Sequence, residues 1–296
     1  MKRFVATVSL IGAIAALATP GEISRASETQ PITIRFSAKV GSQPFSCGKT
    51  YQLGKPATAQ TLSDFRFYVS EVALIDANGK AVPITLAQDD KWQYQNVALL
   101  DFEDKTGACA NGTTEMRDRI IGTVPQGNYT GLKFTLGVPS KLNHEDSVLA
   151  PSPLNLTGLW WNWQFGYKFV RIDLQSPMSG AIDKLKHQGN EESSSGFPIH
   201  LGSAGCQADT GSEKPTRCLY PNRATVVLPR FDPAKNSVEA DLARLVATTN
   251  LNQNQVKTAP GCMSEPNDQN CLGIMTNLGL PFMGKPTATQ TFFQVE

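Results

Sequence analysis

The chain contains three histidines, and two of them stand where a folded site could use them. His144 closely follows a short run that alternates like a strand, and His200 lies in Phe-Pro-Ile-His-Leu-Gly at the entry to a loop. His187 lies among Lys, Gln and Gly, which indicates a solvated position. Neutral imidazole is a good ligand for copper or zinc, so His144 and His200 are candidate metal ligands. A lone histidine is more often a structural residue, so spacing alone leaves both interpretations open.

Three of the four tryptophans fall in the stretch 159–169. If this stretch is extended, Trp161 and Trp163 share one face and Trp160 lies on the other. Three interpretations follow: a core strand with bulky aromatics, a platform that stacks on sugar rings, or an indole beside a metal or a redox partner.

An even number of cysteines in an exported protein favours disulfides over thiol chemistry. The six cysteines are Cys47, Cys109, Cys206, Cys218, Cys262 and Cys271. The short spacings predict the pairs Cys206–Cys218 and Cys262–Cys271, which leaves Cys47–Cys109. Metal ligation by thiolates is the alternative, but no pair has the two-residue gap of a zinc knuckle.

The common catalytic motifs are absent from the sequence. There is no P-loop, no Gly-x-Ser-x-Gly elbow and no His-Glu-x-x-His, and nothing around Ser203 marks it as a nucleophile. The formal charge is +1, with no basic block, which argues against nucleic-acid binding. We therefore expect a binding protein and not an enzyme.

The first residues predict export. Lys2 and Arg3 precede an apolar stretch from Phe4 to Ala18, which is the layout of a Sec signal peptide and short for a membrane span. We predict a signal peptide over 1–26, a mature chain over 27–296 without a membrane span, and a periplasmic location.

The elements that must position these residues are mostly strands. Alternation of apolar and polar residues predicts strands at 32–39, 65–70, 132–138, 167–173, 224–228 and 291–295. Weaker signals predict helices at 113–121 and 241–247, although 238–242 also alternates like a strand. Long loops are predicted at 173–198, 202–223 and 250–277. With no repeat and no linker, the chain is predicted to be a mostly β, single-domain, β-sandwich-like fold with disulfide-stapled loops.

Several motifs in one order resemble the MbnP-like family. They are Asp-Phe-Arg-Phe-Tyr-Val-Ser at 64–70, Leu-Gly-Val-Pro at 136–139, Leu-Asn-His at 142–144, Ala-Pro-Ser-Pro-Leu-Asn-Leu at 150–156, Trp-Asn-Trp-Gln-Phe-Gly-Tyr-Lys-Phe at 161–169, His-Leu-Gly-Ser-Ala-Gly-Cys at 200–206 and Gly-Cys-Met-Ser at 261–264. These are periplasmic copper-binding proteins, also described as the four-Cys half of a metallo-mystery pair, and CorA of methanotrophs is similar.

The resemblance implies a β-rich protein that holds one copper ion through histidines, here His144 and His200. It implies that a nearby tryptophan is converted to kynurenine by a partner MauG/MbnH-like dihaem cytochrome c peroxidase. The candidates are Trp163, slightly preferred because it adjoins Gly-Tyr-Lys-Phe, and Trp161. Two departures stand out: the chain has six cysteines and not four, and a third ligand is not evident, with Met178 or Met275 as a thioether candidate. The rival hypotheses are a carbohydrate-binding protein and an envelope scaffold.

Overall fold

The computed structural model describes Met1, residues 28–176 and residues 196–296. The predicted signal peptide therefore lies outside the described residues apart from Met1, as do His187 and Met178. Among the described residues, no helix has the length and apolar character of a membrane span.

Two sheets form the body of the protein. The first consists of β19 (Phe293–Val295), β18 (Ser237–Asp241), β1 (Thr29–Val40), β9 (Arg119–Pro125) and β6 (Thr85–Leu86) in that order, with β2 (Gln43–Pro44) paired to β1. The second runs β14 (Gly196–Leu201), β13 (Val170–Gln175), β4 (Thr58–Asp76), β10 (Tyr129–Leu136) and β17 (Ala224–Pro229). Strand β4 also pairs with β3 (Thr50–Leu53), β5 (Ala81–Pro83) and β8 (Val97–Asp101), and β8 pairs with β7 (Gln93–Tyr94).

The two sheets pack face to face, as expected for a β-sandwich-like fold. Strand β1 has the burial alternation of a half-buried strand, with Ile34 and Phe36 turned inward. Their side chains join a core cluster that includes Phe67 of β4 and Phe134 of β10, and the Phe36 and Phe134 rings meet edge to face at 5.7 Å. The predicted mostly β fold is confirmed, and burial of these aromatic faces is what holds it together.

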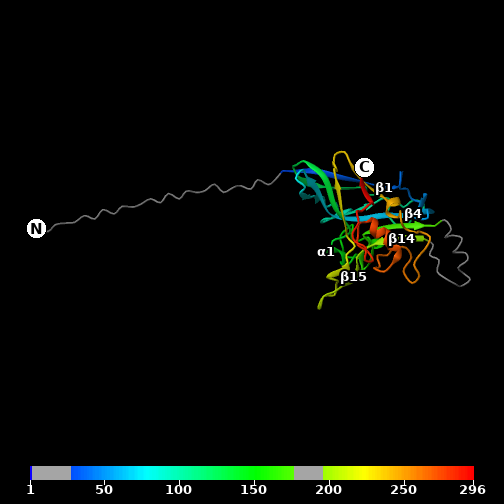
Figure 1. Ribbon diagram of the computed structural model, residues 1–296. Helices are drawn as coiled ribbons and strands as arrows, with labels where there is room; N and C mark the ends of the chain where they lie inside the picture. The colour runs from blue at the N-terminus through cyan, green and yellow to red at the C-terminus, as the bar shows by residue number, and fades with distance from the viewer. Residues whose placement is uncertain (2–27, 177–195) are drawn as a thin grey trace, which may run out of the picture.

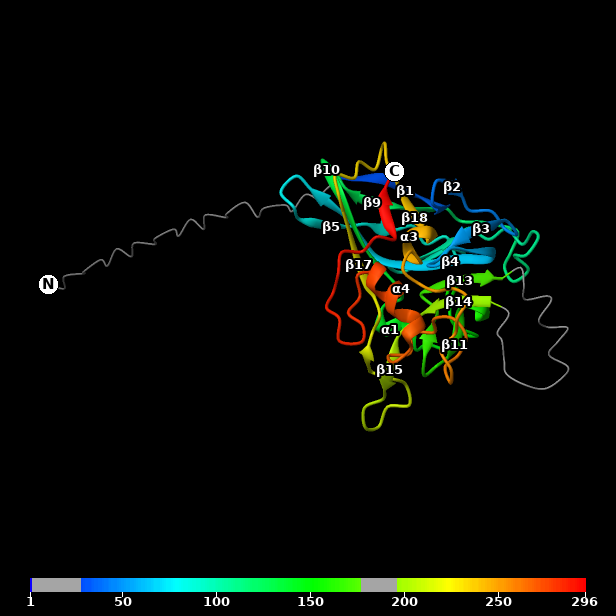
Figure 2. The ribbon, with the colours of Figure 1, turned by 45° about the vertical axis from the view of Figure 1, so that its right-hand side comes forward.

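The second sheet is covered on its other face by residues 138–169, which we call the covering segment. It contains α1 (Ser140–Asn143), η1 (Thr157–Leu159), β11 (Trp160–Asn162) and β12 (Gly166–Tyr167). Tyr68 of β4 points into a second core cluster with Leu154, Leu159 and Tyr167 of this segment. Figure 2 shows β1 and β9 on one side of β4, with α1, β11 and β15 on the other. The protein therefore has a third layer, and that layer carries the His144 motif and the tryptophan motif, whereas His200 lies on β14 of the second sheet.

The remaining elements lie in two of the long loops, apart from α3, which directly follows β18. They are β15 (Ala204–Gln207), β16 (Arg217–Tyr220), α3 (Leu242–Leu245), η3 (Gln269–Cys271) and α4 (Leu272–Asn277). The predicted loops at 202–223 and 250–277 thus contain a hairpin and two short helices. The predicted disulfides form as Cys47–Cys109, Cys206–Cys218 and Cys262–Cys271. None of the six cysteines is a free thiol.

One predicted helix is wrong. Residues 113–118 are irregular apart from a bridge between Arg117 and Asp101, and β9 begins at Arg119. In β9, Ile120 and Val124 are buried, whereas Ile121 and Thr123 between them are exposed. This strand pairs with β1, so burial of one face against the core overrides the weak helical signal. The second predicted helix, 241–247, is partly right, because β18 ends at Asp241 and α3 follows it. The Asp241 carboxylate accepts from the backbone N–H of Ala243 at 2.9 Å and so caps α3.

Candidate metal centre

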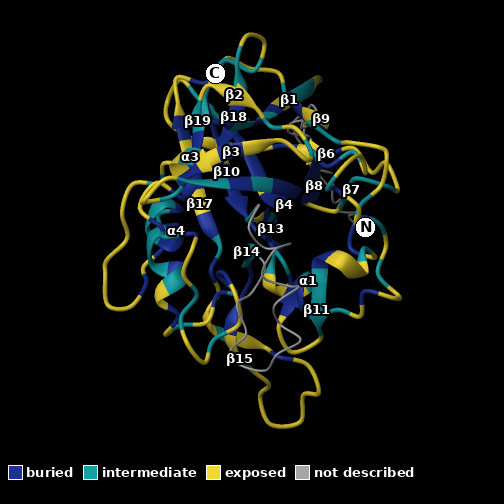
Figure 3. Ribbon diagram, turned by 90° about the vertical axis from the view of Figure 1, so that its right-hand side faces the viewer, coloured by how far each residue is buried: buried dark blue, intermediate teal, exposed yellow. Residues whose placement is uncertain are grey.

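The segments that carry His144 and the candidate tryptophans lie together on the side of the second sheet away from β1, and His200 lies on β14 of that sheet. Figures 1, 2 and 3 all place α1 and β15 there, and Figures 2 and 3 place β11 beside them. The contacts between them are specific. The Asn143 amide oxygen accepts from the backbone N–H of Tyr167 at 3.0 Å, and its nitrogen lies 3.5 Å from Ser203 Oγ. Asn143 thus joins α1 to β12 and to the residues that follow β14.

His144 lies at the end of α1 and is only 3% exposed. Its Nδ1 lies 2.9 Å from the backbone oxygen of Trp163. A carbonyl oxygen can only accept, so Nδ1 carries the proton and Nε2 bears a lone pair in the neutral ring. Burial lowers the pKa of His144, which favours that neutral form near pH 7.

The lone pair of His144 faces two polar neighbours. The Asn143 amide nitrogen lies 3.2 Å from Nε2 and Cys218 Sγ lies 3.5 Å from it. His144, Cys206 and Cys218 have potential ligand atoms within 4.8 Å of one another, but both sulfurs belong to one disulfide. Thiolates are the metal-binding form of cysteine, so the imidazole is the effective ligand of this group.

His200 lies on β14, and its side chain is 12% exposed. Its Nε2 lies 2.7 Å from Asp173 Oδ1 on the neighbouring strand β13. Burial lowers the pKa of His200 despite the neighbouring carboxylate. Burial alone would raise the pKa of Asp173, but the hydrogen bond from His200 and the charge of Arg171 contribute to lowering it to about 2. Asp173 is therefore an ionised acceptor, and Nδ1 of His200 bears the lone pair.

The two candidate tryptophans have different surroundings. The Trp161 indole packs on the backbone of Gly202, so closely that a Cβ built there would lie 2.3 Å from Cζ3. Lys168 Nζ lies 5.8 Å from the centre of the same indole. Trp163 is 50% exposed, and it reaches His144 through its backbone oxygen. Trp161 thus contacts the strand end that follows His200, whereas Trp163 holds His144.

The sugar platform predicted as an alternative is only partly present. Trp160 packs against the second core cluster. The strand β11 ends at Asn162 and Trp163 lies in the following turn, so the extended stretch that would put Trp161 and Trp163 on one face is not formed. Of these three tryptophans, only Trp163 is exposed.

The structure joins the histidine-bearing segments at Asn143 and Ser203, but it gives the two rings separate hydrogen-bond partners. His200 is not part of the group formed by His144 and the Cys206–Cys218 sulfurs. Met275 is fully buried in the main core cluster, and so has a structural environment. Sequence reasoning missed Asn143 and Asp173. The signal for Asn143 was its place directly before His144, but nothing local marks Asp173, which is opposite Pro198 in the ladder.

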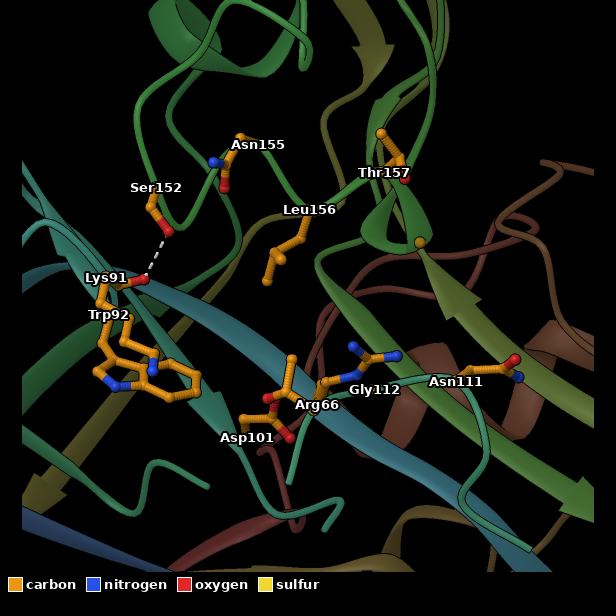
Figure 4. Close-up of a pocket in the computed structure, with 12 residues that line it drawn as sticks. Arg66, Lys91, Trp92, Asp101, Asn111, Gly112, Ser152, Asn155, Leu156 and Thr157 are labelled. Atoms are coloured by element: carbon orange, nitrogen blue, oxygen red, sulfur yellow. Dashed lines mark hydrogen bonds between the residues drawn. The ribbon is translucent and has the colours of Figure 1, made fainter. Parts of the chain in front are cut away.

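A separate cavity of about 320 Å³ opens beside the covering segment, and neither described histidine lines it. Figure 4 shows Arg66 and Asp101 on one side, with Trp92, Leu156 and Thr157 around the opening. Burial raises the pKa of Asp101 to about 7 even though Arg66 is close. Arg66 also pairs with Asp64, so the cavity borders on a buried ion-pair network that reaches toward Asp173.

The comparisons agree with the resemblance of the motifs. A protein-family model described as MbnP matches residues 29–264. A solved structure, MbnP from Methylosinus trichosporium, is 32% identical, with a TM-score of 0.75 over 90% of this chain and 98% of that one. No curated protein sequence matches this chain.

Proposed function

Because this chain belongs to the MbnP family, we propose that it binds one copper ion through His144 and His200, beside a tryptophan that is converted to kynurenine. The observation that carries the proposal is the state of the two imidazoles. Each ring is largely shielded from water, is held by an oxygen acceptor at one nitrogen, and has its lone pair at the other, where that of His144 lies 3.2 Å from the Asn143 amide nitrogen. This is the usual arrangement of a metal-binding histidine, whose second nitrogen is fixed by a carbonyl or a carboxylate.

The donor set suits copper. Imidazole nitrogen is a favourable ligand for copper, and copper stands highest in the affinity order of the divalent first-row metals. The oxidised cysteines offer no thiolates, so a Cys-rich zinc site is not the better interpretation. A kynurenine would add an aryl amine and a ketone oxygen as further donors to the two imidazoles. Either kynurenine donor would be the third ligand, which the sequence did not reveal.

Trp161 is the better supported of the two tryptophans. Its ring packs against Gly202, two residues beyond His200, and the loop that carries it also supplies the carbonyl that holds His144. The Trp163 ring is half exposed. The proposal therefore shifts the slight preference for Trp163 toward Trp161.

The conversion of an indole to kynurenine requires an activated oxidant, which protein side chains do not supply. We therefore include a dihaem peroxidase of the MauG/MbnH type as the partner, with this chain as its substrate and not as a catalyst. Exposed apolar side chains on the loops near His144 and on β16 offer such a partner apolar surface. They are Val148, Leu149, Trp163, Phe165, Leu219 and Tyr220.

The periplasm is the proposed compartment. Three disulfides suit an oxidising environment outside the cytosol, and the predicted signal peptide would direct export. Copper handling or sequestration there is the role that fits a carrier with a buried binding site.

The experiment is metal analysis and peptide mass spectrometry of the chain co-expressed with a dihaem peroxidase. We expect one copper per wild-type chain, and a kynurenine in the peptide that contains Trp161 and Trp163. His144→Ala and His200→Ala should each lose most of the copper. His187→Ala is the matched control and should keep it. Full copper content in the His144→Ala/His200→Ala double variant would refute the site, and two unmodified tryptophans would refute the kynurenine.

A further inference from the structure

We infer that Asp173 is a positioning residue, which fixes the tautomer and the orientation of His200 and so presents the Nδ1 lone pair of that ring to the metal. The inference deepens the proposed function and rests on it. Asp173 and His200 lie on neighbouring antiparallel strands, and Asp173 Oδ1 is 2.7 Å from His200 Nε2. Both side chains are mostly shielded from water, with exposures of 16% and 12%.

Arg171 holds the carboxylate of Asp173 in this orientation. Its Nε and Nη2 both donate to Asp173 Oδ2, at 2.9 and 2.8 Å. This double contact uses the second carboxylate oxygen and leaves Oδ1 to His200. Nη1 of Arg171 donates to the backbone oxygen of Gly158 at 3.0 Å, which ties the arrangement to the covering segment.

A second carboxylate, that of Asp64 on β4, also contacts Arg171 and helps to hold it in place. Asp64 Oδ2 lies 3.0 Å from Arg171 Nε, and the same carboxylate is paired with Arg66. The strand register explains the chain of contacts, because Asp64 is opposite Asp173, and Arg171 is opposite both Arg66 and His200. These side chains share one face of the sheet, while Val170, Ile172 and Leu174 face the main core.

Stability alone does not account for this network. Ion pairs lose their hydration when they are buried, and apolar residues of similar size are often as stabilising in such places. The same strand face could therefore have been packed with aliphatic side chains under the covering segment. A carboxylate aimed at the second nitrogen of a histidine has a specific use, which is to make the ring a better oriented and more basic ligand.

The test compares Asp173→Asn and Asp173→Ala with the wild type in copper affinity, measured by competition with a chelator on peroxidase-treated protein. Loss of such a partner typically weakens metal binding about 10–100-fold. We expect Asp173→Ala at the upper end of this range and Asp173→Asn, whose amide oxygen still accepts, nearer the lower end. Asp232→Asn is the matched control, because Asp232 is in an exposed pair with Lys235, and it should bind like the wild type.

A second readout needs no metal. Nitrogen NMR of the ¹⁵N-labelled apoprotein should show neutral His200 protonated at Nε2 in the wild type, and a loss of that preference in Asp173→Ala. A merely structural role would lower stability without changing the tautomer. Should Asp173→Ala fail to fold, Asp173→Asn is judged by the same NMR signal and by its affinity.

The outcomes separate this inference from the proposed function. Loss of copper in His200→Ala together with unchanged affinity in both Asp173 variants overturns the role of Asp173 and leaves the copper site intact. Wild-type His200 protonated at Nδ1 in the apoprotein also overturns it. Undiminished copper binding in His200→Ala overturns the role of Asp173 together with that of His200.

Discussion

Gly202 offers a way to disturb the candidate centre without removing a ligand. A Cβ at this position would lie 2.3 Å from Trp161 Cζ3 and 2.8 Å from the backbone oxygen of Tyr167. Non-bonded carbon atoms rest about 3.5–4.0 Å apart, so the indole would have to move by more than about 1 Å. The Tyr167 oxygen belongs to β12, whose partner β11 carries Trp161, so the hairpin must shift or the ring must swing outward.

We expect Gly202→Ala to lower the free energy of unfolding by about 1–3 kcal/mol, which is the usual cost of overpacking. Urea unfolding measures this loss, and tryptophan fluorescence should report a changed environment of Trp161 in the folded protein. After co-expression with the peroxidase, the displaced indole should be converted less completely, and copper content should fall with it.

The control is Gly211→Ala, which is destabilising for a different reason. Gly211 has a φ of +85°, and a Cβ at this position would have no other atom within 4 Å, so alanine there is strained but contacts no other residue. If Gly211→Ala loses as much stability as Gly202→Ala but keeps normal copper content, the copper loss in Gly202→Ala is a local effect and not a result of general destabilisation. Wild-type conversion, copper content and stability in Gly202→Ala would refute the proposed packing of Trp161 on Gly202.

Three further changes test other parts of the structure. Burial raises the pKa of Asp101 from its ordinary 3.8 to about 7, so its contribution to stability is full below pH 3.8 and is lost as the pH rises through 7. Asp101→Asn should therefore gain stability relative to the wild type, by up to about 4 kcal/mol, between pH 4 and 8, and a pH-independent difference in urea midpoints would contradict this. Cys206→Ser/Cys218→Ser opens a loop of sequence separation 12 and should cost about 3 kcal/mol in thermal unfolding, with weaker copper binding because Cys218 Sγ lies 3.5 Å from the His144 ring. Phe134→Ala in the main core should cost about 3–5 kcal/mol while one copper per folded chain is retained, and metal loss without unfolding would argue against the separation of core and site.

Much of the fold was predictable because a strand with one buried face has apolar and polar residues in alternation. The alternation around Ile34 and Phe134 located β1 and β10, and the close cysteine spacings indicated which loops are closed by disulfides. The same rule explains the failure at 113–121, where a weak signal for two helical turns overlaps the start of the alternation that contains Ile120 and Val124. A strand that is held by its neighbour β1 carries little local information at its start.

The sequence by itself determined the residue types that can bind a metal and, through the order of its motifs, the family. It could not determine what each side chain meets, because the relevant partners are far apart in the chain. The folding of the covering segment brings the Trp163 carbonyl oxygen to His144 Nδ1. The pairing register of β13 with β14 brings Asp173 to His200. Which nitrogen of each imidazole keeps a lone pair depends on those two contacts, and hydrogen bonds between distant segments exist only once the chain has folded.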